Sequence, residues 1–138
     1  ISNFTPNEKF TEGIKFLENQ ELNGTIFSHY SRGTYISYAG KKNFMDSNFL
    51  YAPGVDTKFL DSDRLIHTEN INIALAIINK YNIKYIWLDK QLIDQLWAGD
   101  EIELLFILKY SPQAFTKIFD NGDVQIYQYK PKELLTNV

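Results

Sequence analysis

The chain has 138 residues, of which 44% are hydrophobic and 22% are charged, a composition typical of one globular domain with its own core. The net charge of −3 argues against a nucleic-acid partner, the lack of Cys excludes a disulfide partner and thiolate metal sites, and no apolar run is long enough to span a membrane. Because the chain opens on Ile1 and its one methionine is Met45, we expect residues 1–138 to be a single α/β domain excised from a longer protein.

The first part of the chain predicts two helices with a strand between them. Residues 7–20 place Phe10 and Leu17 on one face at helical spacing. Residues 25–28 (TIFS) predict a short strand. Residues 34–39 follow between two glycines, and we expect a short helix there.

A short strand and an irregular stretch follow. Residues 43–45 predict the strand, and residues 46–65 predict a long loop, because they contain a Pro53-Gly54 turn and no clear periodicity. A long loop rich in aromatic residues and aspartates is either a functional element or a cover for one sheet edge. Within it, Asp61 and Asp63 form a D-x-D pair that either holds a divalent cation or caps a turn.

Residues 65–89 predict a helix followed by a buried strand. Thr68 is the expected N-cap, the apolar residues after it recur at helical spacing, and Asn82 ends the helix. Residues 83–88 (IKYIWL) are apolar on both faces, as in a strand at the middle of a covered sheet. One face is expected to carry Ile83, Tyr85 and Trp87, and the other Ile86 and Leu88. This unit indicates an α/β sandwich.

Two helices are predicted next. Asp89 is expected to cap a short helix at residues 91–97. Asp100 and Glu103 form a D-x-x-E capping box for the second helix, which Pro112 ends. The expected core side of the second helix consists of Ile102, Leu105, Phe106 and Leu108.

The chain closes with a predicted hairpin. Asn121-Gly122 separates two β-rich runs, residues 115–120 and 123–129, and Asn-Gly is a strong hairpin signal. Residues 130–138 are expected to be a frayed tail. Strand–helix–strand order up to Asp89 gives a parallel pair by right-handed crossover. We therefore predict an α/β fold with a mixed, mainly parallel sheet, helices on both faces and a C-terminal β-hairpin.

The candidate binding residues follow the ends of the parallel strands. Ligands of open α/β sheets bind outside the carboxyl ends of these strands. His29, Tyr30 and Arg32 follow the first strand, and Asp46 follows the second. Aromatic faces stack on sugars or peptides while polar tips fix their orientation, so we expect the four residues to converge on one exposed substrate-binding concavity. The loop at residues 46–65 is expected to form its rim, and residues 89–91, which follow the third strand, are expected to gather at the same end of the sheet. The alternative is that Arg32 pairs with Asp46 only to hold the turn.

No catalytic or metal site is predicted. His29 and His67 are the only histidines, and no nucleophile, base and oxyanion donor stand at recognisable spacing. Neither a nucleophile elbow nor a glycine-rich phosphate loop is present.

A composite pattern of residue types extends over most of the chain. Its parts are Ile26-Phe27-Ser28, Tyr30, Gly33, residues 35–42 (YISYAGKK), Phe44-Met45-Asp46, residues 74–86 (ALAIINKYNIKYI), residues 115–122 (FTKIFDNG) and residues 124–127 (VQIY). The pattern resembles the soluble C-terminal domain of GT-C class, polyprenyl-phosphate-dependent membrane glycosyltransferases, which include archaeal oligosaccharyltransferase-like and mannosyltransferase-like proteins. The W-W-D-Y-G motif of the oligosaccharyltransferases would fall at residues 29–33, where Gly33 matches and Tyr30 supplies an aromatic residue.

The resemblance implies a location and a set of partners. It implies an extracytoplasmic domain of an integral membrane protein that takes part in protein glycosylation, with the protein's own transmembrane part as a partner. Catalytic acidic residues and a divalent cation would belong to that membrane part, so no cofactor is expected here. The domain alone would be non-catalytic and would help bind a glycan or an acceptor polypeptide.

Two other functions stay open at this stage. The chain could be a stand-alone α/β interaction or scaffold domain with no transferase attached. It could also be a small soluble α/β enzyme that uses Asp61, Asp63 or His29.

Overall fold

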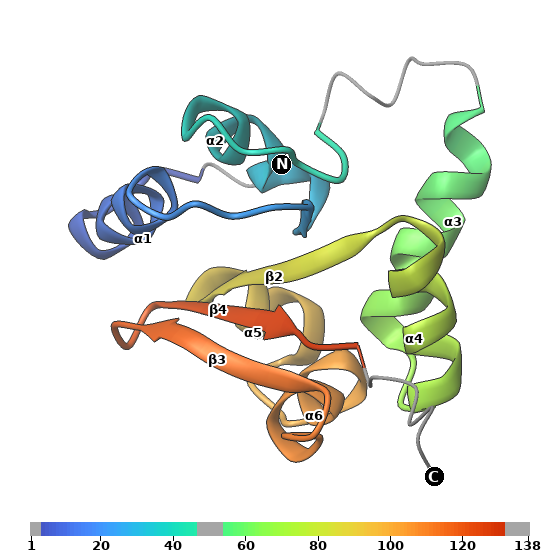
Figure 1. The fold of residues 1–138 in the computed structure, drawn as a ribbon. Helices are drawn as coiled ribbons and strands as arrows, with labels where there is room; N and C mark the ends of the chain where they lie inside the picture. The colour runs from blue at the N-terminus through green and yellow to red at the C-terminus, as the bar shows by residue number, and fades with distance from the viewer. Residues whose placement is uncertain (1–3, 47–53, 132–138) are drawn as a thin grey trace, which may run out of the picture.

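The structure, a computed structural model, describes residues 4–46 and 54–131. Its elements in chain order are α1 (Glu8–Glu18), β1 (Thr25–Phe27), the 3-10 helix η1 (Tyr30–Arg32), α2 (Gly33–Tyr38), α3 (Val55–His67), α4 (Ile71–Lys80), β2 (Ile83–Asp89), α5 (Lys90–Trp97), α6 (Glu103–Tyr110), β3 (Phe115–Asp120) and β4 (Val124–Tyr129). The strands form one sheet in the order β1-β2-β4-β3 (Figure 1).

The sheet is mixed, as predicted, but it is mostly antiparallel. Only β1 and β2 pair in parallel, while β4 pairs antiparallel with both β2 and β3. The expectation of a mainly parallel sheet is wrong because the predicted strand at residues 43–45 contributes a single bridge, between Ile26 and Asn43. Phe44 and Met45 are both buried, so this segment turns inward and does not alternate like a strand. The predicted hairpin is confirmed, and its strand β4 takes the place beside β2.

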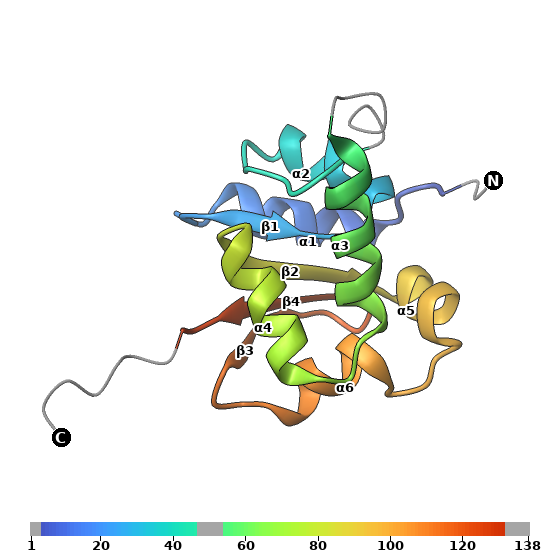
Figure 2. The ribbon, with the colours of Figure 1, turned by 90° about the vertical axis from the view of Figure 1, so that its right-hand side faces the viewer.

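Helices cover both faces of the sheet, as predicted (Figures 1 and 2). On one face, α1 and α2 pack around Trp87, whose side chain is fully buried, while α5 lies at the end of β2 and contributes to both clusters. On the other face, α3, α4 and α6 pack around Ile86 and Leu88. Among the described residues no helix is long and apolar enough to cross a membrane.

Strand β2 is buried on both faces, and one residue departs from the predicted alternation. Tyr85 and Trp87 share a face, but Ile83 lies in the opposite cluster with Ile86 and Leu88. The register of β1 against β2 shifts at this point, because Thr25 pairs with Ile83 and the next residue of β1 pairs with Tyr85. An extra residue on one strand breaks the two-residue alternation and explains the position of Ile83.

The helix ends confirm two of the predicted signals, Asp89 and Asn82, and correct the other two. Asp89 accepts from the Leu92 backbone N–H at 3.1 Å and caps α5. Asn82 has a φ of +54°, a left-handed conformation that ends the helical run. The N-cap of α4 is Asn70 and not Thr68, because the Asn70 side chain accepts from two N–H groups of the first turn. Thr68 instead forms the C-cap of α3.

The capping box predicted at Asp100 is not formed. Helix α6 begins at Glu103, whose N–H donates to Glu69 Oε1 at 3.1 Å, and its N-cap is Ile102. The predicted core side of the helix is correct in part, because Leu105 and Leu108 are buried. Ile102 and Phe106, which were expected inside, are exposed. The buried residues of α6 are Leu104, Leu105, Ile107 and Leu108.

The predicted long loop at residues 46–65 is largely a helix. Residues 55–67 form α3, and Leu65 and Ile66 are buried against the core. The remainder of that stretch, residues 47–53, lies outside the described residues, as does most of the predicted tail at 130–138.

Candidate functional site

The parallel strands β1 and β2 end at the same edge of the sheet (Figure 2). The segment after β1 forms η1 and runs into α2, and the segment after β2 runs into α5. The two segments are joined by a hydrogen-bonded network between Arg32 and the residues Asp89 and Gln91. This edge is therefore where the predicted binding residues meet.

Arg32 is the centre of this network although only 1% of its surface is exposed. Its Nε donates to Asp89 Oδ2 at 2.8 Å, and its Nη2 donates to Asp89 Oδ1 at 3.2 Å and to Gln91 Oε1 at 2.6 Å. Trp87 Nε1 also donates to Asp89 Oδ2, at 3.1 Å, and the Phe4 ring lies 3.8 Å from the guanidinium carbon. A buried charge pair with this many partners fixes the relative position of η1 and α5.

Arg32 does not form the predicted pair with Asp46. Asp89 is its partner because β2 is the direct parallel neighbour of β1 and delivers a buried carboxylate beside η1. Asp46 nevertheless lies at the same edge, packed against Gly33. A Cβ at Gly33 would lie 2.2 Å from the Met45 carbonyl oxygen and 2.8 Å from Asp46 Cα. The close approach of these two segments therefore requires glycine at position 33.

His29 and Tyr30 line a small hollow between η1 and α3. Their ring centroids are 4.3 Å apart, and the Phe59 ring lies 6.1 Å from that of Tyr30. Ser62 and His67 of α3 complete the polar part of the hollow, whose volume is about 50 Å³. The hollow thus offers aromatic faces beside polar tips, which is the chemistry expected of a sugar or peptide contact.

His29 is held in place by its neighbours in η1. Its Nδ1 lies 2.7 Å from Ser31 Oγ and also accepts from the Ser31 backbone N–H at 3.3 Å. Burial lowers the pKa of His29, the positive charge of Arg32 lowers it further, and the more distant carboxylate of Asp89 acts in the opposite direction. The imidazole is therefore neutral at pH 7.

The four predicted residues thus have different surroundings at one edge of the sheet. Arg32 faces inward and positions the segments around it, so it is not placed to touch a ligand. His29 and Tyr30 line the hollow. Asp46 is half-buried beside Gly33.

The segment at residues 46–65 does border the hollow, as predicted for its rim, but the bordering part is the helix α3 and not a loop. The lining residues of α3 are Phe59, Ser62, Asp63, Ile66 and His67. Their spacing of three and four residues is that of one helix face. This periodicity was present in the sequence, but the preceding Pro53-Gly54 and the aspartate-rich composition favoured a loop.

The D-x-D pair does not form a metal site. Asp61 and Asp63 are two residues apart on α3, so their side chains point to different sides of the helix. Asp61 accepts from Lys80 Nζ at 2.9 Å and from the Tyr81 hydroxyl, whereas Asp63 lies 3.8 Å from His67 Nε2. Within residues 4–46 and 54–131, no group of three or more His, Cys, Asp or Glu residues is arranged to hold a metal ion.

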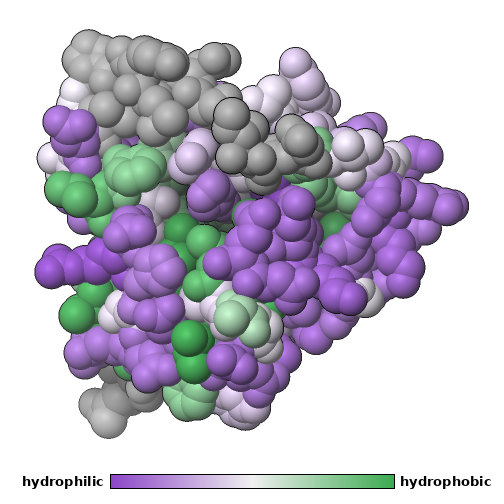
Figure 3. Space-filling view, turned by 180° about the vertical axis from the view of Figure 1, so that it is seen from behind, coloured by the Kyte–Doolittle hydropathy of each residue, from purple (hydrophilic) through white to green (hydrophobic). Residues whose placement is uncertain are grey.

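Figure 3 views the molecule from the side on which α5 lies and toward which β1 and β2 run. Hydrophilic side chains dominate this face, and hydrophobic ones appear as separate patches, some of them recessed.

Comparisons with known proteins give a likeness in structure. No family model matches the chain, and no curated protein matches it in sequence. One crystal structure of the C-terminal globular domain of an oligosaccharyltransferase from Archaeoglobus fulgidus superposes with a TM-score of 0.70 at 16% identity, covering 92% of this chain and 100% of that chain. A second crystal structure with the same description has a TM-score of 0.60 at 15% identity and covers 94% of this chain and 100% of that chain.

This chain has the fold of that domain. The resemblance predicted from the residue pattern is therefore confirmed at the level of the fold. The likeness extends over the whole length of the oligosaccharyltransferase domain.

Proposed function

We propose that this chain is a non-catalytic, extracytoplasmic domain of a membrane glycosyltransferase, where it helps bind the acceptor polypeptide or the glycan. The observation that carries the proposal is the shared fold with the oligosaccharyltransferase domain over nearly the whole chain. The transmembrane part of the same protein is its expected partner. The binding surface is the hollow lined by His29, Tyr30 and Phe59.

The size of the hollow supports a helping role. Pockets that enclose a whole small ligand measure about 300–1,000 Å³, whereas this hollow measures about 50 Å³. It admits one side chain or one edge of a sugar ring. The remainder of the ligand would then contact another part of the protein.

The alternative of a small enzyme would use Asp61, Asp63 or His29, and of these His29 has a possible nucleophile beside it, since its Nδ1 lies 2.7 Å from Ser31 Oγ. The same Nδ1 accepts the backbone N–H of Ser31 and caps η1, and Ser31 Oγ accepts from Arg32 Nη1 at 3.2 Å. Both groups therefore serve the local turn, which argues against a nucleophile and its base. We expect the chain alone to show no turnover of a polyprenyl-phosphate sugar. Turnover that disappears in Ser31→Ala would contradict the proposal and favour the enzyme.

Binding is tested by NMR titration of the labelled chain with an acceptor peptide and, separately, with a glycan. The expected shifts fall on residues 29–32 and on the inner face of α3. Tyr30→Ala and Phe59→Ala should weaken binding, since each removes an aromatic face of the hollow. Tyr38→Ala is the matched control, because Tyr38 is 80% exposed on α2 and does not line the hollow. Shifts confined to the turn at Asn121-Gly122 would exclude this surface.

The stand-alone scaffold alternative is tested on the full coding sequence. A glycosyltransferase of the proposed kind carries many membrane spans upstream of this domain. A coding sequence without such spans would contradict the proposal and favour the scaffold.

A further inference from the structure

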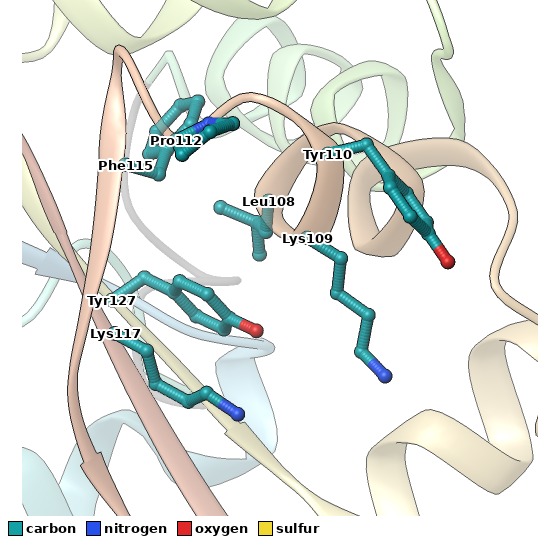
Figure 4. A pocket seen from close by; sticks show the side chains of 7 residues that line it. All are labelled: Leu108, Lys109, Tyr110, Pro112, Phe115, Lys117 and Tyr127. Carbon is teal, nitrogen blue, oxygen red and sulfur yellow. The ribbon is translucent and has the colours of Figure 1, made fainter.

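A second pocket lies between α6 and the β3–β4 hairpin (Figure 4). Strand β3 is the outer strand of the sheet on the side opposite β1. Leu108, Phe115 and Tyr127 form its inner wall. Its volume is about 420 Å³, within the range of about 300–1,000 Å³ that is usual for small-molecule sites. The pocket shares no residue with the hollow at His29 and Tyr30.

Two lysines from different elements extend toward the open side of this pocket. Lys109 comes from α6 and Lys117 from β3, and Figure 4 shows both side chains directed to the same opening. Lys109 Nζ donates to Glu101 Oε2 at 2.6 Å, and Lys117 Nζ donates to Asp120 Oδ2 at 2.7 Å. All four side chains are between 32% and 42% exposed. Ion pairs this exposed contribute little to stability and exchange readily.

Each carboxylate keeps another donor if its lysine turns to a ligand. Glu101 Oε1 accepts from the Tyr110 hydroxyl at 2.6 Å, and Asp120 Oδ1 accepts from the Gly122 N–H at 2.9 Å. An ammonium group also has three N–H donors, so a lysine can bind a second anion without leaving the first. The two carboxylates therefore hold the lysines at the mouth of the pocket and still leave them available.

Aromatic groups flank the lysines and suit a sugar ring. The side chain of Tyr110 is 57% exposed at the rim, beside Lys109. The Tyr127 hydroxyl projects into the space between Lys109 and Lys117 in Figure 4 and lies 3.1 Å from Gln125 Oε1. Burial raises the pKa of Tyr127, so the phenol stays protonated and its oxygen can accept a hydrogen bond. Stacking and hydrogen-bonding groups thus surround two cations.

We propose that this pocket binds an anionic sugar unit, namely a pyranose ring that carries a carboxylate or a phosphate. The anion lies between Lys109 and Lys117, and the ring packs against Tyr110. The two lysine ammonium groups contact the anion as separate point charges, while the aromatic face and the Tyr127 hydroxyl recognise the ring. This proposal does not depend on the function proposed for the hollow lined by His29 and Tyr30.

The test is calorimetric and NMR titration of the chain with glucuronate and glucose 1-phosphate, with glucose and inorganic phosphate as comparison ligands. We expect the two anionic sugars to shift residues 108–117 and Tyr127, and to bind more tightly than glucose or phosphate. Lys109→Ala and Lys117→Ala should each weaken binding about tenfold, the effect of losing one charged hydrogen bond. Raising the salt concentration should weaken binding further.

The matched control is Lys15→Ala, since Lys15 is exposed on α1 away from this pocket. Equal affinity for glucose and glucuronate would overturn the anionic part of the proposal, and equal affinity for phosphate alone would overturn the sugar part. An oligoglutamate peptide that binds more tightly than glucuronate would assign the pocket to acidic polypeptides instead. Loss of binding in Lys15→Ala to the same extent as in Lys109→Ala would also overturn it.

Discussion

Arg32 is a buried cation whose removal would leave Asp89 without its countercharge. Both charged groups are almost inaccessible to solvent, with side chains 1% and 2% exposed. We expect Arg32→Ala to lower the free energy of unfolding by about 3–5 kcal/mol, the usual cost of breaking a buried ion pair. Urea unfolding followed by circular dichroism measures the loss. Lys80→Ala, which breaks the exposed pair with Asp61, is the control and should cost far less. Equal losses would mean that the Arg32 network does not hold this edge together.

Gly33 permits the contact between α2 and the backbone of Met45 and Asp46. Replacing a helical glycine with alanine normally stabilises a helix. At position 33 the new Cβ would meet the Met45 carbonyl oxygen at 2.2 Å, and a backbone atom cannot turn aside as a side chain can. We expect Gly33→Ala to cost about 1–3 kcal/mol, as for other overpacked sites. Thermal unfolding measures it, and a raised melting temperature would contradict the packing described.

His29 should make stability depend on pH in a defined window. Its pKa in the folded chain is lowered by burial and by Arg32, while an unfolded histidine titrates near 6.5. As the pH falls below about 6.5, the unfolded state therefore takes up the proton first. Stability is fully present above this pH and decreases as the pH falls toward the lowered folded pKa.

The measurement for His29 is urea unfolding between pH 7 and pH 3. His29→Gln should flatten the curve just below pH 6.5. It should keep the separate decline at lower pH, which arises because the pKa values of Asp61 and Asp120 are lowered by hydrogen bonds from Tyr81 and Lys117. An unchanged curve in His29→Gln would show that another group titrates in the upper window.

At the scale of elements, the two tryptophans test the packing of β2 and α5. From sequence we expect Trp87→Ala to cost more than Trp97→Ala, because Trp87 lies in the two-sided strand and Trp97 on a short helix. In the structure both side chains are buried, and Trp97 Nε1 donates to the Ile66 carbonyl at 3.1 Å. We therefore revise the expectation: each substitution should cost about 3–5 kcal/mol. Chemical unfolding of both variants measures the two losses in the free energy of unfolding. A small loss for Trp97→Ala together with a large one for Trp87→Ala would favour the sequence-based expectation.

The sequence predicts elements well where local signals and tertiary contacts agree. Strand β2, its cap at Asp89 and the Asn121-Gly122 hairpin follow from periodicity and turn chemistry, and all are present. The core side of α6 was predicted in part, since Leu105 and Leu108 are buried as expected whereas Phe106 is exposed. The start of this helix was missed because it depends on a hydrogen bond from Glu103 to Glu69, more than thirty residues away. Such a partner leaves no local signal.

The candidate site, like the helices and strands, could be predicted from the sequence only in part. The edge of the sheet was predicted from strand order, and Gly33 and Asp46 do meet there. The partner of Arg32 was not predicted, because the choice between Asp46 and Asp89 depends on which segment forms a true strand beside β1. Residues 43–45 and 83–89 both contain the necessary apolar residues, and only the three-dimensional packing distinguishes them.

At the scale of the whole molecule, the C-terminal hairpin supplies the centre of the sheet. Strand β4 lies between β2 and β3, and Val124 and Ile126 pack beside Trp87. We expect a chain that ends at residue 113 to lose cooperative unfolding, since β2 would have one open edge and its buried residues would be exposed. A chain that ends at Pro131 keeps every described element and is the control. Calorimetry measures the thermal unfolding of both chains. A sharp transition in the chain that ends at residue 113 would show that cooperative unfolding does not depend on the hairpin.

The position of β4 also sets the timing of folding during synthesis. While the ribosome is still translating residues 124–129, β1, β2, β3 and the helices α1 to α6 of the described residues have already been synthesised, yet the strand that separates β2 from β3 is missing. The nascent chain must keep Trp87 and Leu88 from aggregating until its last strand emerges. A stop codon or a translational pause shortly before Val124 would thus leave an aggregation-prone polypeptide that chaperones and proteases recognise. This would happen although almost the entire domain has been synthesised.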